Sequence, residues 1–131
     1  MPSRVEDWLR QADRDLEAAL TTAGAGQFDW SCFAGHQASN KALKALYQHH
    51  NAKGWGHVLY RLVDGLVESE PGLADLRDTA RILDKYYIPT RYPNGLDAGA
   101  PADAYTKAEA DAALRDAQAI VQFCKTRCRP A

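Results

Sequence analysis

Apolar residues recur along most of this chain at steps of three and four, which is the spacing of one face of an α-helix. The first such segment begins at Ser3, because Ser3 and Glu6 have the spacing of a capping box, and it ends near Gly24. We therefore predict an amphipathic first helix. Its apolar stripe comprises Val5, Trp8, Leu9, Ala12, Leu16, Ala19 and Leu20.

A second helical pattern runs from about Asp29 to His50, and Asp29 is placed to cap its first turn. Small residues cover one broad side of this helix. Because alanine side chains let neighbouring helices approach closely, we expect tight helix packing along that side. The residues concerned are Ala34, Ala38, Ala42 and Ala45.

Two shorter patterns follow. The apolar residues between Trp55 and Leu66 predict a short third helix, comprising Trp55, Val58, Leu59, Leu62, Val63 and Leu66. Pro71 then introduces a fourth helix, because proline is favoured in the first turn. We expect this helix to continue through Tyr87 and to end at Pro89. Its apolar positions are Leu73, Leu76, Ala80, Leu83 and Tyr87.

The connection from Pro89 to Tyr105 is rich in Gly, Pro, Ala and Asp, and it is longer than most connections in a compact domain. It is therefore either functional or mobile, and we expect only its first third to be ordered. Thr106 and Glu109 form a second capping-box pattern that opens a final helix. We expect the tail beyond Lys125 to fray. The inward positions of this helix are Ala110, Ala113, Leu114, Ala117, Ile120, Val121 and Cys124.

No segment shows the alternation of a β-strand, so these patterns predict an all-α fold. We expect one domain over residues 1–131, folded as an up-and-down antiparallel bundle of four long helices plus one short helix.

Composition narrows the classes of function. The 131 residues carry a formal charge of -1, which excludes a broadly basic nucleic-acid-binding surface, so any contact with RNA or a nucleotide must be local. Three cysteines and an N-terminus without a secretory signal predict a cytoplasmic protein with reduced thiols. No apolar run is long enough to span a membrane. Cys124 and Cys128 lack further ligands at metal-site spacings, so we expect neither a metal nor a cofactor.

The clearest candidate for a binding site is the stretch from Tyr86 to Gly95, in which one arginine stands among tyrosines and prolines. Pro89 and Pro93 disfavour the α conformation in the residues before them, so we predict a stiff, extended loop that points Arg91 in a defined direction. A guanidinium beside phenol rings suits a phosphate or a nucleotide. We predict that Arg91 is the main anion contact and that Tyr87 and Tyr92 stack on a base or ribose.

Other polar residues are candidates to assist Arg91. Lys41 and Lys44 share one face of the second helix, which serves either as a solvated surface or as a second anion contact. His57 follows two glycines near the start of the third helix, where it either acts on a phosphate or bonds a neighbouring carbonyl and fixes the helix start. His36 is a weaker candidate, because it has no acidic or thiol partner at a helical step.

Three segments, in this order and spacing, resemble the signatures of the HEPN domain family, named for higher eukaryotes and prokaryotes nucleotide-binding. The segment Phe33 to Leu46 is similar to the family's QQAAEKALKAL helix, and Leu83 to Pro93 is similar to its LDxxYIPTRYP signature. Trp55-Gly56-His57-Val58-Leu59 resembles the start of its His- and Leu-containing helix. The resemblance covers Trp8 to Cys124 and is strongest to small stand-alone prokaryotic members.

This resemblance implies an up-and-down helical bundle that forms a homodimer and binds nucleotides or RNA, often paired with a minimal nucleotidyltransferase as in toxin–antitoxin systems. Many members are metal-independent ribonucleases that carry an R-x4-6-H motif. Here Leu96, Asp97 and Ala98 stand where that histidine would follow Arg91. The usual ribonuclease motif is therefore absent, and whether the protein is an enzyme stays open.

We carry three hypotheses forward. In the first, the protein is a non-catalytic module that binds a nucleotide or phosphate. In the second, it is a divergent metal-independent ribonuclease that uses Arg91 and His57. In the third, it is a structural interaction domain in which Arg91 pairs with a carboxylate such as Asp84.

Overall fold

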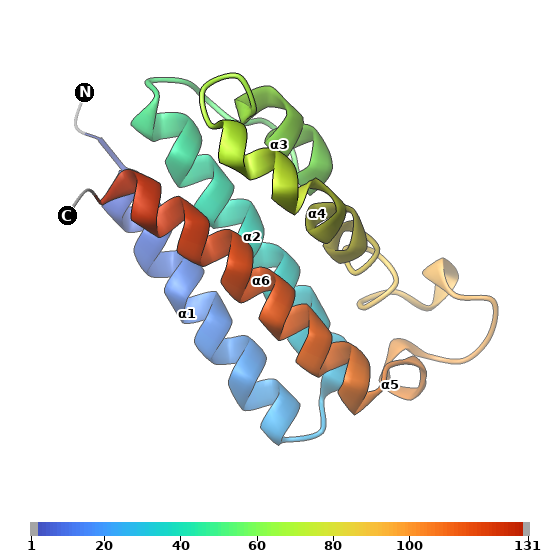
Figure 1. Cartoon of the computed structure of the whole chain (residues 1–131). Coiled ribbons are helices and arrows are strands. Elements are labelled where there is room, and N and C mark those ends of the chain that lie inside the picture. The colour runs from blue at the N-terminus through green and yellow to red at the C-terminus, as the bar shows by residue number, and fades with distance from the viewer. Residues whose placement is uncertain (1–2, 130–131) are drawn as a thin grey trace.

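The structure, a computed structural model, describes residues 3–129. Three long helices lie side by side: α1 (Val5–Gly24), α2 (Phe28–His49) and α6 (Lys107–Cys128) (Figure 1). No strand occurs in the described residues, and the prediction of an all-helical bundle is confirmed.

Small residues set the close packing of α2, as expected. Ala38, Ala42 and Ala45 are fully buried, whereas Ala34 is only partly buried. Gly35 faces α6 so closely that a Cβ atom added there would lie 3.3 Å from the carbonyl oxygen of Ala113. A larger side chain at position 35 would therefore push α2 and α6 apart.

The helices run in the up-and-down order of the predicted bundle. Helix α1 runs antiparallel to α2, because the backbone amide of Arg4 bonds to Gln48 at the end of α2. Figure 1 shows α2 and α6 running parallel, and Gly35 and Ala113 meet near the start of both helices. This is the up-and-down order that we predicted, because the chain returns along the bundle between α2 and α6 before α6 begins.

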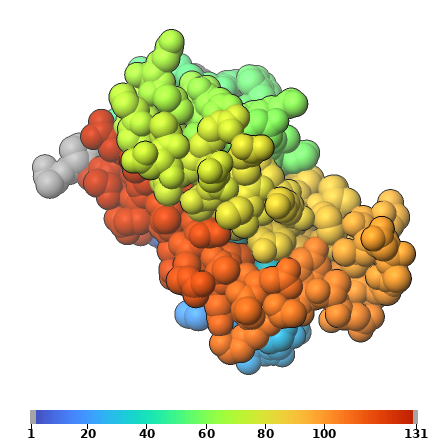
Figure 2. Space-filling view, turned by 45° about the vertical axis from the view of Figure 1, so that its right-hand side comes forward, coloured from blue at the N-terminus to red at the C-terminus, as the bar shows by residue number. Residues whose placement is uncertain are grey.

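That return is made by α3 (Leu59–Leu66), the 3-10 helix η1 (Pro71–Leu76) and α4 (Arg77–Asp84). Figure 2 shows this part of the chain, green to yellow, beside α6 in orange to red. The leucines that anchor it are buried: Leu62, Leu66, Leu73 and Leu83.

The fourth helix was expected to run unbroken from Pro71 through Tyr87, and this prediction is wrong. Its first turns are 3-10, and α4 ends at Asp84. The amides of Lys85 and Tyr86 bond three residues back, to the carbonyls of Ile82 and Leu83, which tightens the chain into a turn. This early turn carries Tyr87 away from the helix axis and toward α2, as the contacts of its ring described below show.

The third helix was expected to include Trp55, but the segment before Leu59 is not helical. It runs back along α2 from the end of that helix to the level of His36, whose ring meets the carbonyl of His57. Two glycines permit this path. Gly56 has a φ of +82°, and a Cβ on Gly54 would lie 2.8 Å from the Tyr47 ring.

The helix ends are only partly as predicted. Thr106 and Glu109 form the expected capping box at the start of α6. Ser3 and Glu6 do not, because the Glu6 carboxylate pairs with Arg129 instead. Asp29 lies inside the first turn of α2 and does not cap it.

Helix α6 continues to Cys128, past the residue where we expected fraying. Ion pairs to α1 hold this end: Lys125 Nζ lies 3.1 Å from Asp13 Oδ1, and Arg129 Nη2 lies 2.7 Å from Glu6 Oε2. The tail is therefore tied to the start of the bundle through residue 129.

The connection between α4 and α6 contains two short helices that we did not expect, η2 (Pro93–Gly95) and α5 (Pro101–Ala104). Gly95 packs on the backbone of Pro89, where an added Cβ would lie 2.9 Å from the Pro89 Cα atom. This contact folds the loop back on itself. Across residues 3–129, no helix has the length and apolar character needed to cross a membrane.

Candidate functional site

Arg91 lies in a compact turn that follows α4. The backbone amides of Arg91 and Tyr92 both donate to the carbonyl of Ile88, at 3.0 and 3.2 Å. The buried hydroxyl of Thr90 donates to the carbonyl of Tyr86. The prediction of an extended loop is therefore wrong before Tyr92, which itself is extended with φ −130° and ψ 129°. The loop is nevertheless rigidly held, by hydrogen bonds as well as by prolines.

The Arg91 guanidinium is oriented by a carbonyl and three aromatic rings. Its Nε donates to the carbonyl of Tyr87 at 2.9 Å. Its Cζ lies 4.3 Å from the ring centroid of Phe33, 4.5 Å from Tyr87 and 5.2 Å from Tyr92. Rings placed over a guanidinium in this way attract the cation and fix its plane.

No carboxylate within residues 3–129 forms an ion pair with Arg91. Asp84, which the third hypothesis paired with it, accepts hydrogen bonds from the amides of Leu59 and Tyr60, at 2.7 and 3.1 Å. It therefore caps the start of α3. The two terminal nitrogens of Arg91 have no hydrogen-bond partner in the described chain, so their donors are available to a ligand.

Tyr87 is the centre around which this site is built. The His57 ring stacks on it, with centroids 3.7 Å apart and planes 10° apart. The rings of His36 and Phe33 approach it at 5.1 and 6.2 Å. Through Tyr87 the structure brings His57 and Arg91 into one cluster, as the second hypothesis requires.

His36 packs against this cluster through the Tyr87 ring. The sequence indicated it only as a weaker candidate. Its ring is fully buried, with Nε2 3.0 Å from the His57 carbonyl and 3.6 Å from Asp84 Oδ1. Its Nδ1 lies 3.1 Å from Nε2 of Gln37. Because the His57 carbonyl only accepts, Nε2 donates to it, and Nδ1 accepts from the Gln37 amide.

The two lysines of α2 do not join Arg91. Lys41 forms an ion pair with Asp15 of α1. Lys44 Nζ lies 5.8 Å from the ring centroid of Trp8, also on α1. Burial, followed by the nearby charge of Lys41, lowers the pKa of Lys44. Both side chains are half-buried against α1, so neither a freely solvated face nor a shared site with Arg91 describes them.

A groove between α1 and α2, of about 440 Å³, lies next to the cluster. Phe33 belongs to both, and Trp30 packs edge-on against Phe33 with centroids 6.1 Å apart. Lys41 lines the groove together with Asp15, whereas Arg91 does not line it. The site is thus an open aromatic surface around Arg91 that continues into a shallow groove through Phe33.

The thiols of this chain do not supply a nucleophile at neutral pH. Burial raises the pKa of Cys32 to about 12 and that of Cys128 to about 11, and it also raises the pKa of Cys124. Each thiol is therefore protonated near pH 7. Between residues 3 and 129, no three His, Cys, Asp or Glu side chains come together as metal ligands.

Comparison with known proteins matches the chain to one family. The HEPN domain family matches residues 5–127. The chain is similar to the crystal structure of TT1696 from Thermus thermophilus, with a TM-score of 0.92 and 42% identity over 96% of this chain and 99% of that one. It is also similar to ST0689, described as an archaeal HEPN homologue, with a TM-score of 0.82 and 36% identity over 98% of this chain and 100% of that one.

A further relative is a protein of Methanocaldococcus jannaschii named "Putative toxin MJ1304". It is 25% identical over 130 residues, which cover 90% of this chain and 84% of the relative.

Proposed function

The chain belongs to the HEPN domain family, and from this premise we propose that it is a non-catalytic module that binds an RNA or nucleotide phosphate through Arg91. The observation that carries the proposal is the state of the Arg91 guanidinium. It is held by the Tyr87 carbonyl and by aromatic rings, while no acidic side chain of residues 3–129 neutralises it.

Two other arginines of the chain are engaged in ion pairs. Arg77 places Nε 2.7 Å from Asp64, and Arg127 places Nε 2.7 Å from Glu70. These ion pairs connect elements of the bundle. Arg91 makes no such connection, and its planar donors match the oxygens of a phosphate. An oriented guanidinium loses little freedom when it binds an anion, which favours binding over a purely structural role.

The aromatic residues take different roles in this proposal. Tyr87 is already covered by His57 and Arg91, so it positions the guanidinium. Tyr92 is 50% exposed and is the better platform for a base. His57 is exposed beside Tyr87 and is a second donor for the phosphate. Lys41 and Lys44 lie outside this cluster and are not needed for it.

We further propose that the protein acts in the cytoplasm as a homodimer, paired with a minimal nucleotidyltransferase in a toxin–antitoxin system. The support is the family and the name of the M. jannaschii relative. Light scattering on the purified chain tests the dimer. Co-purification with a nucleotidyltransferase encoded by a neighbouring gene tests the partner, and failure to co-purify when both are expressed together contradicts it.

A second candidate function is a divergent ribonuclease. The observation that favours it is that His57 and Arg91 both contact the Tyr87 ring, as the second hypothesis requires. A histidine supplies general acid or base catalysis, and an arginine stabilises charge on the phosphate. Labelled RNA incubated with wild type and with His57→Ala decides this: cleavage by the wild type alone supports a nuclease, and equal cleavage by both, or by neither, contradicts it.

The binding proposal predicts a specific loss in Arg91→Ala. Fluorescence anisotropy of a 5′-phosphorylated, labelled RNA oligomer should show binding weakened by about 1.5–3 kcal/mol, the value of a charge-assisted hydrogen bond. Arg81→Ala is the matched control, because Arg81 is an exposed arginine of α4 that lies 3.7 Å from Asp78. Wild type that binds neither RNA nor any common nucleotide would overturn the proposal.

A further inference from the structure

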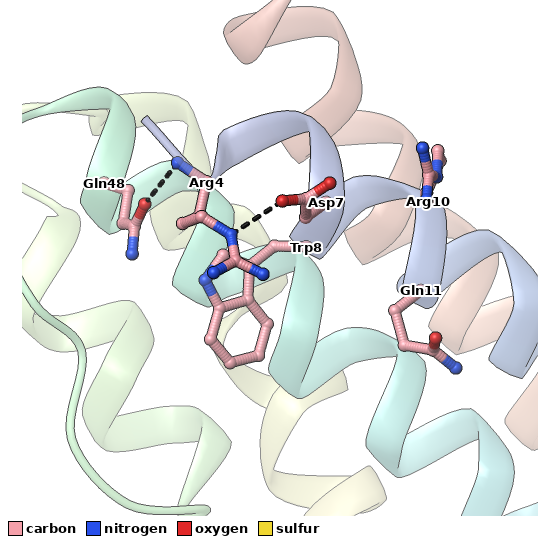
Figure 3. A pocket seen from close by; sticks show the side chains of 6 residues that line it. All are labelled: Arg4, Asp7, Trp8, Arg10, Gln11 and Gln48. Atoms are coloured by element: carbon pink, nitrogen blue, oxygen red, sulfur yellow. Dashed lines mark hydrogen bonds and ion pairs between the residues drawn. The ribbon is translucent and has the colours of Figure 1, made fainter. Parts of the chain in front are cut away.

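A second aromatic and basic surface lies at the other end of α2. We call it the tryptophan groove. It has a volume of about 220 Å³ and is lined by Trp8, Lys44, Gln48, Lys53, Gly54 and Trp55. Through Trp8 and Gln48 it continues into a larger hollow of about 500 Å³ at the start of α1, where Arg4 and Arg10 add two more basic side chains. Figure 3 shows Arg4 joined to both Asp7 and Gln48 at this hollow.

The charges that line these two hollows are mostly positive. Asp7 is the one carboxylate among their lining residues, and it already pairs with Arg4 at 2.6 Å. Lys44 and Lys53 have aromatic partners in place of acidic ones: Lys44 Nζ lies 5.8 Å from the Trp8 ring, and Lys53 Nζ lies 5.8 Å from the Trp55 ring. Burial already lowers the pKa of Lys44, so a bound anion would stabilise its charged form.

Trp55 is 80% exposed, yet the backbone that carries it is firmly held. Gly54 lies against the Tyr47 ring, and the carbonyl of Gly56 accepts a hydrogen bond from Asn40 at 3.2 Å. A large ring on a fixed backbone, with one face free, is a ready stacking platform. Packing inside this chain does not account for a tryptophan at this position.

We propose that the tryptophan groove binds one nucleotide of single-stranded RNA, with its base stacked on Trp55 and its phosphate held by Lys44 and Lys53. Aromatic rings interleaved with lysines bind single strands without sequence preference, because every base has a face to stack and every nucleotide a phosphate. This site is separate from Arg91 and does not rest on the function proposed for it.

The path between the two sites supports a strand as the occupant. Trp55 and His57 lie two residues apart on the segment that runs along α2, and His57 stacks on Tyr87 of the Arg91 cluster. On α2 itself, Lys44 and Phe33 are 11 residues apart, which is about 16 Å at the helical rise. A strand of several nucleotides is long enough to contact both sites at once.

The test uses the full chain and a ten-residue oligouridylate, with UMP and inorganic phosphate as separate probes. We expect Trp55→Ala to weaken oligouridylate binding by about 5- to 150-fold. Lys53→Gln should reduce the slope of log K against log salt by about 0.7, the value of one phosphate contact to a single strand. The exposed Ile82 and Lys107 provide the controls Ile82→Ala and Lys107→Gln, which should leave both quantities unchanged.

The outcomes separate the two sites. If Trp55→Ala weakens binding while Arg91→Ala does not, the tryptophan groove stands and the function proposed for Arg91 fails. If Arg91→Ala weakens binding while Trp55→Ala stays within twofold of wild type, the groove proposal is overturned alone. UMP, which carries one base and one phosphate, should compete for the groove, whereas inorganic phosphate binding as tightly as the oligomer would overturn the proposal, since the site would then bind an anion without a base. So would a change in oligomeric state in Trp55→Ala, which would assign the ring to a protein interface.

Discussion

At the scale of single residues, the candidate site depends on Tyr87 more than on any residue expected to touch a ligand. Its ring carries the stacked His57 at 3.7 Å, and its carbonyl holds the Nε of Arg91 at 2.9 Å. One residue therefore sets the position of the other two. A tyrosine that we first expected to stack on a ligand is better understood as the support for the site.

This arrangement predicts that Tyr87→Ala loses RNA binding to about the same degree as Arg91→Ala, although Tyr87 need not touch the phosphate. The guanidinium loses one of its three rings, and His57 loses its stacking partner. Tyr87→Phe keeps the ring and should bind RNA like the wild type. Anisotropy titrations of the three variants check this, and full binding by Tyr87→Ala would contradict the role assigned to the ring.

Arg91, Tyr87 and His57 were all predicted from the sequence, because two of them share one short loop and the third follows conspicuous glycines. The contacts of His36 could not be predicted in this way. Its partners lie 21 residues away at His57 and 48 residues away at Asp84, so only the tertiary fold reveals them. The one available signal was a histidine on the small-residue side of α2.

Lys41 illustrates the same limit from the opposite side. Its spacing on α2 predicted a face shared with Lys44, which is correct, but its partner Asp15 lies 26 residues earlier on α1. An ion pair between two helices depends on how those helices are rotated about their axes. Periodicity within one helix does not contain that information.

At the scale of elements, the start of α3 is tied to the end of α4 by Asp84. Its carboxylate accepts hydrogen bonds from the amides of Leu59 and Tyr60, although it lies 25 and 24 residues away from them. Asp84 therefore caps α3, although it is distant in the sequence. The same carboxylate lies 3.6 Å from His36, so the cap is joined to the candidate site.

We predict that Asp84→Ala lowers the free energy of unfolding by about 0.5–2 kcal/mol, the range for the loss of a helix cap. Asp84→Asn should cost less, because its amide oxygen still accepts one of the two bonds. Urea unfolding followed by circular dichroism measures both values. If Asp84→Ala is as stable as the wild type, the carboxylate is not acting as a cap.

The long helices were predicted to within a few residues because their signals are local: an apolar stripe, a glycine at the end of α1 and a capping box at the start of α6. The region from residue 50 to residue 105 was predicted less well. There Trp55 lies outside α3, and Tyr87 leaves α4 for a tertiary contact. Apolar residues of an exposed surface or a binding site can have the three- and four-residue spacing of a helix without lying in one.

At the scale of the whole molecule, buried thiol and phenol groups make the free energy of unfolding fall at alkaline pH. Burial raises the pKa of Cys32 and of Tyr86 to about 12, and that of Cys128 to about 11. In the unfolded chain a thiol titrates near 8.5 and a phenol near 10. The folded state therefore holds protons that the unfolded state releases first.

It follows that the stabilisation from these groups is fully present below about pH 8.5 and is lost as pH rises toward their folded values. We predict a lower free energy of unfolding at pH 10 than at pH 7, measured by urea titration under reducing conditions. Cys32→Ala should reduce this dependence on pH. A free energy that is unchanged or higher at pH 10 would show that these groups are not protected by the fold.

The all-helical architecture and its up-and-down order both followed from the sequence. In an up-and-down bundle, the two helices on either side of a returning segment run parallel, as α2 and α6 do. Here the chain between His49 and Lys107 covers the bundle before α6 starts. That excursion brings residues 53–57 and 87–92 against α2, and so it builds both surfaces that we propose for RNA.

The central claim is that Arg91 and its aromatic neighbours bind phosphate, and nuclear magnetic resonance tests it most directly. Titrating isotope-labelled protein with a 5′-phosphorylated RNA oligomer should shift the Nε–H signal of Arg91 and the amides of residues 87–92. The same oligomer without its terminal phosphate should shift them less. If the oligomer binds and these signals stay in place while others move, Arg91 is not the anion contact and the account of this site is wrong.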